Sequence, residues 1–347
     1  MHTKKLTGGF LLATDYKLSL ASTKIANDAY ITPSITINSS EEEMLKYIEE
    51  LNYITGIEKI DYVFPIRTGD VAALVTHYDE LKFKALIPTT NVNKLEMLND
   101  KFMLMCLLEE LKLPHPLFTK FTNVEEFDIC ANRIIQKLED IDDKVVIKPR
   151  KTSGSRGMRI VSLSMDNDAK WDQFINKKPS ENIYMTKKQL IATAGWTRTF
   201  DMIMMEYLSG DEFTVDCLCN KGELLMTTIR KRIATDGGIS SKAVIVHNIN
   251  YPDIMKACKE IVKNLNLSYN VGFQFKCDSR GIPKMIECNP RLQGTTCLSL
   301  EAGRDFIYGS IMIAEGLINK CKLENQAITV DYMERTYQEW YEKGGLY

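Results

Sequence analysis

Two segments that read as β-hairpins constrain the fold of this 347-residue chain more than any other feature. The first, FTVDCLCNKGELLMTTIR, is predicted to turn at Asn220-Lys221-Gly222. The second, VGFQFKCDSRGIPKMIECNP, is predicted to turn at Ser279-Arg280-Gly281. Short polar turns with glycine between β-branched and aromatic runs are typical of hairpins. The second half of the chain is therefore predicted to contain antiparallel sheet.

Residues 9 to 95 show a different pattern, in which short apolar runs alternate with helical periods. GFLLAT, AYITPSI and IDYVFPI are predicted strands, and EEEMLKYIEELNYI is a predicted amphipathic helix with Ser40 and Glu43 placed for a capping box. Such alternation favours a parallel sheet flanked by helices. The predicted fold class is therefore an α/β segment followed by an α+β segment, with the break near residues 88–94.

The segment between these two parts predicts a helix and two strands. A helical period runs over residues 94–113 and should end at Pro114 and Pro116. KVVIKP reads as a strand, and RIVSLS could return antiparallel to it. A helix is expected at about 304–319, and the aromatic tail after it should pack back on the body.

Composition excludes several classes of protein. The net charge of −2 gives no global basic field for nucleic acid, and no apolar stretch approaches the ~20 residues that span a bilayer. The nine cysteines include no C-x-x-C pair, which favours reduced, buried thiols in a cytoplasmic protein. Neither H-E-x-x-H nor G-x-S-x-G is present, so a metalloprotease or serine hydrolase gains no support.

The stretch IECNPRLQGT contains the residues best suited to bind a metal ion and an anion. Glu287, Asn289 and Arg291 alternate, so on a strand they share one face, and Gln274 of the preceding strand could face Glu287. Carboxylate and amide oxygens suit Mg²⁺, and arginine binds carboxylate or phosphate. The alternative is that these are surface residues at the end of a strand.

The loop KPRKTSGSRGM is flexible and strongly cationic. Its serine and glycine amides could form a nest for an anion, and lysine and arginine add charge around it. The spacing is neither that of a Walker A loop nor that of a Rossmann fingerprint. A solvated hairpin tip is the alternative.

Two further stretches suggest contacts with a ligand. In MMEYLSGDEFTVDC, an extended linker after Glu206 could bind a flat heterocycle such as adenine, and Glu212 could accept ribose hydroxyls. In TIRKRIATDGGISSKAVIV, Arg230 lies in a basic strand before a Gly-Gly turn and could contact substrate or phosphate. A plain hairpin and a solvated charged face are the respective alternatives.

The order of these pieces resembles the ATP-grasp superfamily over nearly the whole chain. The matching pieces are Lys101 after Asp100, Lys148 before the Gly/Ser loop, MEYLSGDEFTVD, the basic strand, Gln274 and E-x-N-x-R. The chain looks most similar to the carbamoyl phosphate synthetase-type proteins, in which a glutamine often stands where other branches have an acidic metal ligand.

The resemblance implies an ATP-grasp fold, in which two α+β subdomains clasp a nucleotide, after a short parallel-sheet domain. It places the pre-grasp domain at 1–93, the grasp domain at 94–320 with a lid at about 145–205, and a tail at 321–347. The chain starts at what is normally the second strand of the pre-grasp domain, so either a partner that completes this domain or a homodimer is expected. One grasp unit, a glycine-poor flap and a short C-terminal part argue against both biotin carboxylase and the carbamoyl phosphate synthetase large subunit.

The resemblance also implies a role for individual residues. ATP and Mg²⁺ are the implied cofactors, with Mn²⁺ as an expected substitute, and residues 152–158 are the implied flap. The implied catalytic residues are Arg291, Lys148 and Arg230, and the implied metal ligands are Gln274, Glu287 and Asn289. The implied nucleotide-binding residues are Lys101, Lys148, Ser153, Gly154, Ser155, Gly157, Met158, Glu206, Tyr207, Leu208 and Glu212.

The expected function is that of an ATP-dependent carboxylate–amine ligase. ATP would phosphorylate a small amino-acid-like acid, and an amine would displace phosphate from the acylphosphate. Two alternatives stay open: a non-catalytic or regulatory ATP-binding subunit, and a kinase that stops at the acylphosphate. The expected partners are small molecules, with neither nucleic acid nor membrane.

Overall fold

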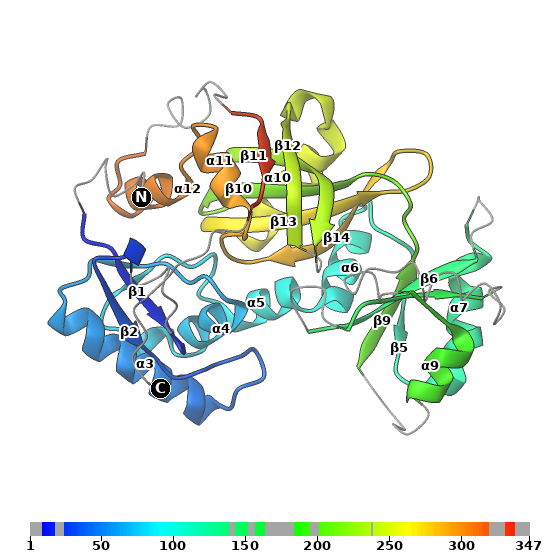
Figure 1. Ribbon diagram of the computed structural model, residues 1–347, viewed down its shortest axis with the longest axis horizontal. Coiled ribbons are helices and arrows are strands. Elements are labelled where there is room, and N and C mark those ends of the chain that lie inside the picture. Colours follow the sequence, from blue (N-terminus) through cyan, green and yellow to red (C-terminus); the bar gives the residue numbers. More distant parts are fainter. Residues whose placement is uncertain are drawn as a thin grey trace.

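The computed structural model describes residues 9–17, 24–138, 143–151, 157–163, 184–194, 201–236, 239–318 and 330–336. Figure 1 shows a five-stranded sheet with its helices to one side, a six-stranded sheet beside it, and the N-terminal segment below the latter.

The N-terminal segment pairs its short strands in parallel, as predicted. β1 (Leu12–Asp15) pairs with β2 (Asp28–Ile31), and β3 (Tyr62–Val63) pairs with β4 (Lys84–Ala85). Within the described residues these are two separate two-stranded sheets, so the single parallel sheet that the sequence predicted is not formed there.

Two helices form most of the core of this segment. Met44, Ile48 and Leu51 of α3 (Glu41–Ile57) pack against Val71 and Leu74 of α4 (Thr68–Thr76) and other buried side chains. The predicted capping box of α3 is confirmed, since Ser40 and Glu43 each bond the other's backbone amide. A short 3-10 helix, η1 (Tyr78–Glu80), follows α4.

The helical period over 94–113 forms two helices instead of one. α5 (Val92–Asn99) and α6 (Lys101–Glu110) are separated by Asp100, which has an extended conformation. The Asp100 carboxylate accepts bonds from the Phe102 and Met103 amides, and Arg150 donates to both of its oxygens. The buried cap and ion pair thus start α6 at Lys101 and tie it to the end of β6, which sequence periodicity could not show.

The five-stranded sheet has the order β5-β9-β6-β7-β8, and β7 returns antiparallel to β6 as predicted. Helices α7 (Phe127–Ile135) and α9 (Lys187–Ala194) pack their apolar side chains against this sheet, and η2 (Val124–Glu126) precedes α7. The sheet also includes β5, which lies outside the lid range expected at about 145–205. The strands are β5 (Phe118–Phe121), β6 (Lys144–Pro149), β7 (Arg159–Ser162), β8 (Tyr184–Thr186) and β9 (Met202–Glu206).

The six-stranded sheet has the order β14-β13-β10-β11-β12-β15 and contains both predicted hairpins. Lys221 and Gly222 adopt positive φ angles of 47° and 83°, which suits a tight two-residue turn. The described part of the tail packs on the body by pairing β15 with β12. The strands are β10 (Glu212–Asn220), β11 (Glu223–Asp236), β12 (Ile239–Val246), β13 (Tyr269–Cys277), β14 (Pro283–Asn289) and β15 (Tyr332–Glu334).

One face of the six-stranded sheet is apolar and packs against α6 and α10 (Pro252–Leu265), which follows η4 (Asn248–Asn250). Phe213, Val215 and Phe273 lie in this core and are at most 1% exposed. The helix expected at 304–319 is shorter, since α12 (Phe306–Ala314) follows α11 (Thr296–Glu301) and ends before Gly316, whose φ is 71°.

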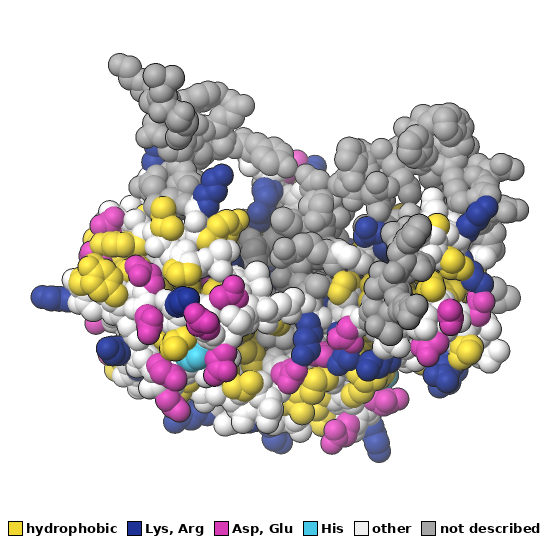
Figure 2. Space-filling view, turned by 90° about the horizontal axis from the view of Figure 1, so that it is seen from below, with side chains coloured by type: hydrophobic (Ala, Val, Ile, Leu, Met, Phe, Trp, Pro, Cys, Tyr) yellow, Lys and Arg dark blue, Asp and Glu magenta, His cyan; other side chains and the backbone are white. Residues whose placement is uncertain are grey.

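Of the eight cysteines in the described ranges, six are buried and all have free thiols, in agreement with the predicted reduced state. No helix in the same ranges is long and apolar enough to cross a bilayer. Figure 2 shows acidic and basic side chains interspersed over the described part of one face, without a broad basic patch there.

Candidate functional site

The predicted register between Gln274 and Glu287 is confirmed. Gln274 lies directly opposite Glu287 on β14 and opposite Thr214 on β10. Opposed residues of antiparallel strands project from the same face, and Asn289 follows Glu287 by two positions. The three predicted metal ligands therefore share the polar face of the six-stranded sheet.

Lys148 lies on β6 and is 9% exposed. Burial lowers its pKa; the charge of Glu287 opposes this shift, and Lys101 reinforces it. Lys148 belongs to the five-stranded sheet, Lys101 begins α6, and Glu287 belongs to the six-stranded sheet. Charged groups of three elements thus act on one another at the junction of the two sheets.

Arg291 follows β14 and joins the sheet to the N-terminal segment. Its Nη2 donates to Asn289 Oδ1 at 3.1 Å, and its Nε lies 3.4 Å from Thr68 Oγ1 at the start of α4. Burial lowers the pKa of Arg291, and the carboxylates of Glu287 and Asp70 oppose this shift. The guanidinium therefore sits in a partly desolvated position under the influence of two acids, and its Nη1 also donates to the carbonyl of Leu292 at 2.9 Å.

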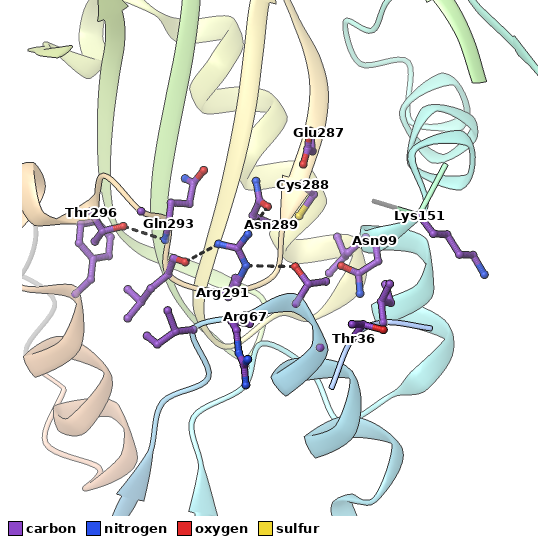
Figure 3. Close-up of a pocket in the computed structure, with 18 of the residues that line it drawn as sticks. Thr36, Arg67, Asn99, Lys151, Glu287, Cys288, Asn289, Arg291, Gln293 and Thr296 are labelled. Atoms are coloured by element: carbon purple, nitrogen blue, oxygen red, sulfur yellow. Dashed lines mark hydrogen bonds between the residues drawn. The ribbon is translucent and has the colours of Figure 1, made fainter. Parts of the chain in front are cut away.

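A pocket of about 700 Å³ opens beside this cluster. Glu287, Asn289 and Arg291 line one part of it, in order along β14 and the loop that follows (Figure 3). Arg67 and Thr68 line it from the N-terminal segment, which also supplies apolar side chains. This volume is in the range of small-molecule sites.

The donor set fits a magnesium ion that arrives with a triphosphate. It consists of one carboxylate and two amides, and Asn289 Oδ1 already accepts one bond from Arg291. No group of three His, Cys, Asp or Glu side chains that could hold a metal occurs among the described residues. Mg²⁺ commonly takes one or two protein carboxylates together with phosphate oxygens and water, so this set suits a shared ion better than a resident one.

The predicted adenine-binding segment begins at Glu206, whose side chain already has hydrogen-bond partners within the protein. Glu206 is 5% exposed, and its carboxylate accepts bonds from the Leu117 amide at 2.8 Å and from Lys284 Nζ at 2.6 Å. Tyr207 lies under Lys144, whose Nζ is 5.3 Å from the ring centroid. Leu208 is 3% exposed. With the Glu206 carboxylate engaged, any contact with a base falls to the backbone of this segment.

The other predicted nucleotide residues are only partly described. Glu212 begins β10, where Arg232 donates to it and Lys276 Nζ lies 3.9 Å away. Gly157 has a φ of 76° and lies close to the side chain of Pro149. The carbonyl of Met158 accepts a hydrogen bond from Arg159. The remainder of the predicted flap, including Ser153, Gly154 and Ser155, lies outside the described residues.

Arg230 forms part of a buried network that the sequence did not reveal. It is 1% exposed; its Nη2 donates to Asp216 at 2.8 Å and its Nη1 donates to the carbonyl of Thr295. Asp216 also accepts bonds from Gln293, Thr296 and Ser299. This network attaches residues 293–299, which follow Arg291 in the chain and are called the segment behind Arg291 below, to the six-stranded sheet. A single acid within the apolar run FTVDCLC was the one sequence signal for it.

Replacing Asp216 with alanine is expected to lower the free energy of unfolding by about 3–5 kcal/mol, because Arg230 would be left buried without its counter-ion. Chemical denaturation measures this loss. The matched control is Asp211→Ala, which removes the more exposed ion pair with the neighbouring Lys231 and should cost less than about 1 kcal/mol. Equal losses in the two variants would contradict the structural role of Asp216.

Comparisons with known proteins agree with this architecture. Residues 198–336 match the family model described as "ATP-grasp in the biosynthetic pathway with Ter operon". The carbamoyl phosphate synthase large chain of Lachnoclostridium phytofermentans is 22% identical over 253 residues, which are 71% of this chain and 21% of that protein. The chain thus spans about a fifth of the length of this curated relative.

Solved structures extend the likeness to most of the chain. Biotin carboxylase from Campylobacter jejuni, solved as a β-γ-ATP complex, has a TM-score of 0.65 and 19% identity over 93% of this chain and 70% of its own. The L-amino acid ligase from Bacillus licheniformis has a TM-score of 0.58 and 12% identity over 90% and 76%. The architecture that the chain shares with these structures, together with the family model matched by residues 198–336, shows the ATP-grasp fold that the motifs led us to expect.

Proposed function

We propose that the chain is an ATP-dependent carboxylate–amine ligase that activates a small amino-acid-like acid as an acylphosphate. The observation that carries this proposal is the convergence of Lys148, Glu287 and Arg291 beside a pocket of about 700 Å³. Phosphate-binding charge and a potential carboxylate anchor occur there together. The ATP complex of one structural relative and the ligase activity in the name of another are consistent with it.

The proposed reaction has two steps. A carboxylate oxygen of the acid attacks the γ-phosphorus of ATP, the bond to the bridging oxygen breaks, and ADP leaves. The amine nitrogen then attacks the acyl carbon, phosphate leaves with the bonding electrons, and the amine loses a proton. These two steps depend on neutralising the charge of the phosphates and on aligning the reacting groups more than on a covalent catalyst.

Each protein group has a limited part in these steps. Lys148 and Lys101 would neutralise phosphate oxygens, and Arg291 would orient the acid's carboxylate toward the γ-phosphorus. Gln274, Glu287 and Asn289 would hold Mg²⁺, which supplies charge stabilisation for the phosphates when bound. Arg230 would act by positioning the segment behind Arg291, since Asp216 and Thr295 already engage its guanidinium.

The test is ADP release from the purified protein with ATP, Mg²⁺, a panel of amino acids and a panel of amines. Acid-dependent ADP release with an amide product is expected. ATP binding without turnover across a broad panel would instead favour the regulatory subunit. Hydroxylamine trapping of an activated acid, with no amide from any amine, would favour the kinase.

A further inference from the structure

We propose that the acid taken by this pocket is a monocarboxylic amino acid with an apolar side chain at least as large as that of leucine. This inference rests on the proposed function and specifies its substrate class. It concerns the part of the pocket away from Glu287 and Asn289, where side chains from the N-terminal segment meet α11 and α12.

The wall of the pocket is apolar close to the proposed carboxylate anchor. Ile66 lines the pocket and is 57% exposed. It stands two residues before Thr68, whose hydroxyl lies 3.4 Å from Arg291 Nε. Ile37, Leu300 and Ile307 line the same pocket and are only partly buried. These partly exposed apolar side chains come from two helices and from loops of the N-terminal segment, and burying them under an apolar group is favourable.

The charges of the pocket do not provide for a second carboxylate on the acid. Arg67 pairs with Asp15 at 3.3 Å and with Asp70 at 3.0 Å. Lys151 pairs with Glu96 at 2.5 Å. The other two lining cations, Lys101 and Arg291, already have parts in the proposed function. A dicarboxylic acid would thus place its second carboxylate against the apolar side chain of Ile66, where each lining cation is already paired or already has a part in the proposed function.

The apolar wall of the pocket argues against bicarbonate as the acid. The pocket extends from Glu287 and Asn289, the proposed Mg²⁺ ligands, to Ile66 and Ile307, so an acid held by Arg291 reaches both the phosphates and the apolar wall. Bicarbonate has no apolar group and would leave this wall uncovered. The side chain of leucine, methionine or phenylalanine would cover more of it.

The experiment measures kcat/KM for acid-dependent ADP release with hydroxylamine as a common nucleophile. The panel contains leucine, methionine and phenylalanine, the small acids glycine and bicarbonate, and the dicarboxylic acids aspartate and glutamate. The kcat/KM values of the apolar acids should exceed those of both other groups by at least about tenfold, which is the lower end of the discrimination that hydrophobic pockets achieve. A tenfold preference for the small or the dicarboxylic group would overturn the inference while leaving the ligase activity intact.

The variant Ile66→Lys tests whether this wall is responsible. Its exposure makes the substitution compatible with folding, and the new cation should lower the leucine-to-glutamate ratio of kcat/KM by at least about tenfold. The control is Ile249→Lys, because Ile249 is 87% exposed and does not line the pocket. An unchanged ratio in Ile66→Lys would also overturn the inference.

A binding measurement separates this inference from the proposed function. With a non-hydrolysable ATP analogue present, leucine should raise the melting temperature of the wild type more than glutamate does, and Ile66→Lys should abolish this difference. If no acid in the panel supports ADP release, the ligase proposal fails, and the melting shifts still decide the ligand class. Equal shifts by leucine and glutamate in the wild type would count against an apolar ligand.

Discussion

Glu287→Gln is expected to lower acid-dependent ADP release by about 10²–10³-fold, which is the usual cost of removing one preorganised electrostatic contact to a transition state. Glu287 is the one carboxylate among the three predicted metal ligands. Its charge also acts on both Lys148 and Arg291 and favours the protonated form of each, as the directions of their pKa shifts indicate. Glutamine keeps the shape of the side chain and removes this charge, so the effect should fall on turnover and not on folding.

The measurements for Glu287→Gln are steady-state ADP release over a range of Mg²⁺ concentrations, together with the melting temperature. Glu260→Gln is the control, because Glu260 is exposed on α10 and lies outside the candidate site. The control should retain wild-type turnover. Full activity in Glu287→Gln at every Mg²⁺ concentration would remove Glu287 from the proposed site.

Lys148→Met is expected to lower kcat/KM for ATP by about 10²–10³-fold and to raise the melting temperature of the nucleotide-free protein. The lowered pKa of Lys148 means that folding disfavours its charged form, with burial as the main cause. Methionine has a similar length and carries no charge, so it removes both this penalty and the proposed contact with phosphate. Activity assays and thermal melts measure the two effects separately.

Lys120→Met is the matched control for Lys148→Met. Lys120 and Lys148 lie opposite the same residue, Ile203, from the two sides of β9, and Lys120 is exposed. Neither activity nor melting temperature should change appreciably in this control. A nucleotide-free Lys148→Met protein that melts well below the wild type would contradict the view that this charge is held at a cost in stability.

The same pKa shift predicts a pH dependence of stability. Between the lowered pKa of folded Lys148 and the unfolded value of about 10.4, the unfolded chain binds more protons than the folded chain. The free energy of unfolding should therefore gain a positive contribution as the pH rises through this interval. Denaturation curves of the wild type and Lys148→Met over that interval isolate the contribution, which should be absent from the variant.

The sequence predicted correctly those features that are stabilised by residues close to one another in the chain. The turn at Lys221 and Gly222, the capping box of Ser40, and the pairing of Gln274 with Glu287 follow from turn chemistry, capping and strand alternation. These devices act within a few residues or across one hairpin. The pattern of the sequence therefore contains nearly all the information that they need.

Features that depend on distant contacts were missed. The extended backbone of Asp100 is stabilised by Arg150 from another element, so a helical period alone could not predict the break before Lys101. The pocket wall at Ile66 and Thr68 comes from a segment that carries no catalytic motif. The bonds of Asp216 to Gln293, Thr296 and Ser299 likewise join residues that are 77 to 83 positions apart in the sequence.

The central claim is that the acid is activated by transfer of phosphate from ATP to its carboxylate. The most direct measurement uses an acid that supports turnover, labelled with ¹⁸O in both carboxylate oxygens, and analyses the released phosphate by mass spectrometry. One ¹⁸O atom is expected in each phosphate formed, because the attacking carboxylate oxygen leaves with phosphorus. Phosphate that contains no label during amide formation would contradict this claim.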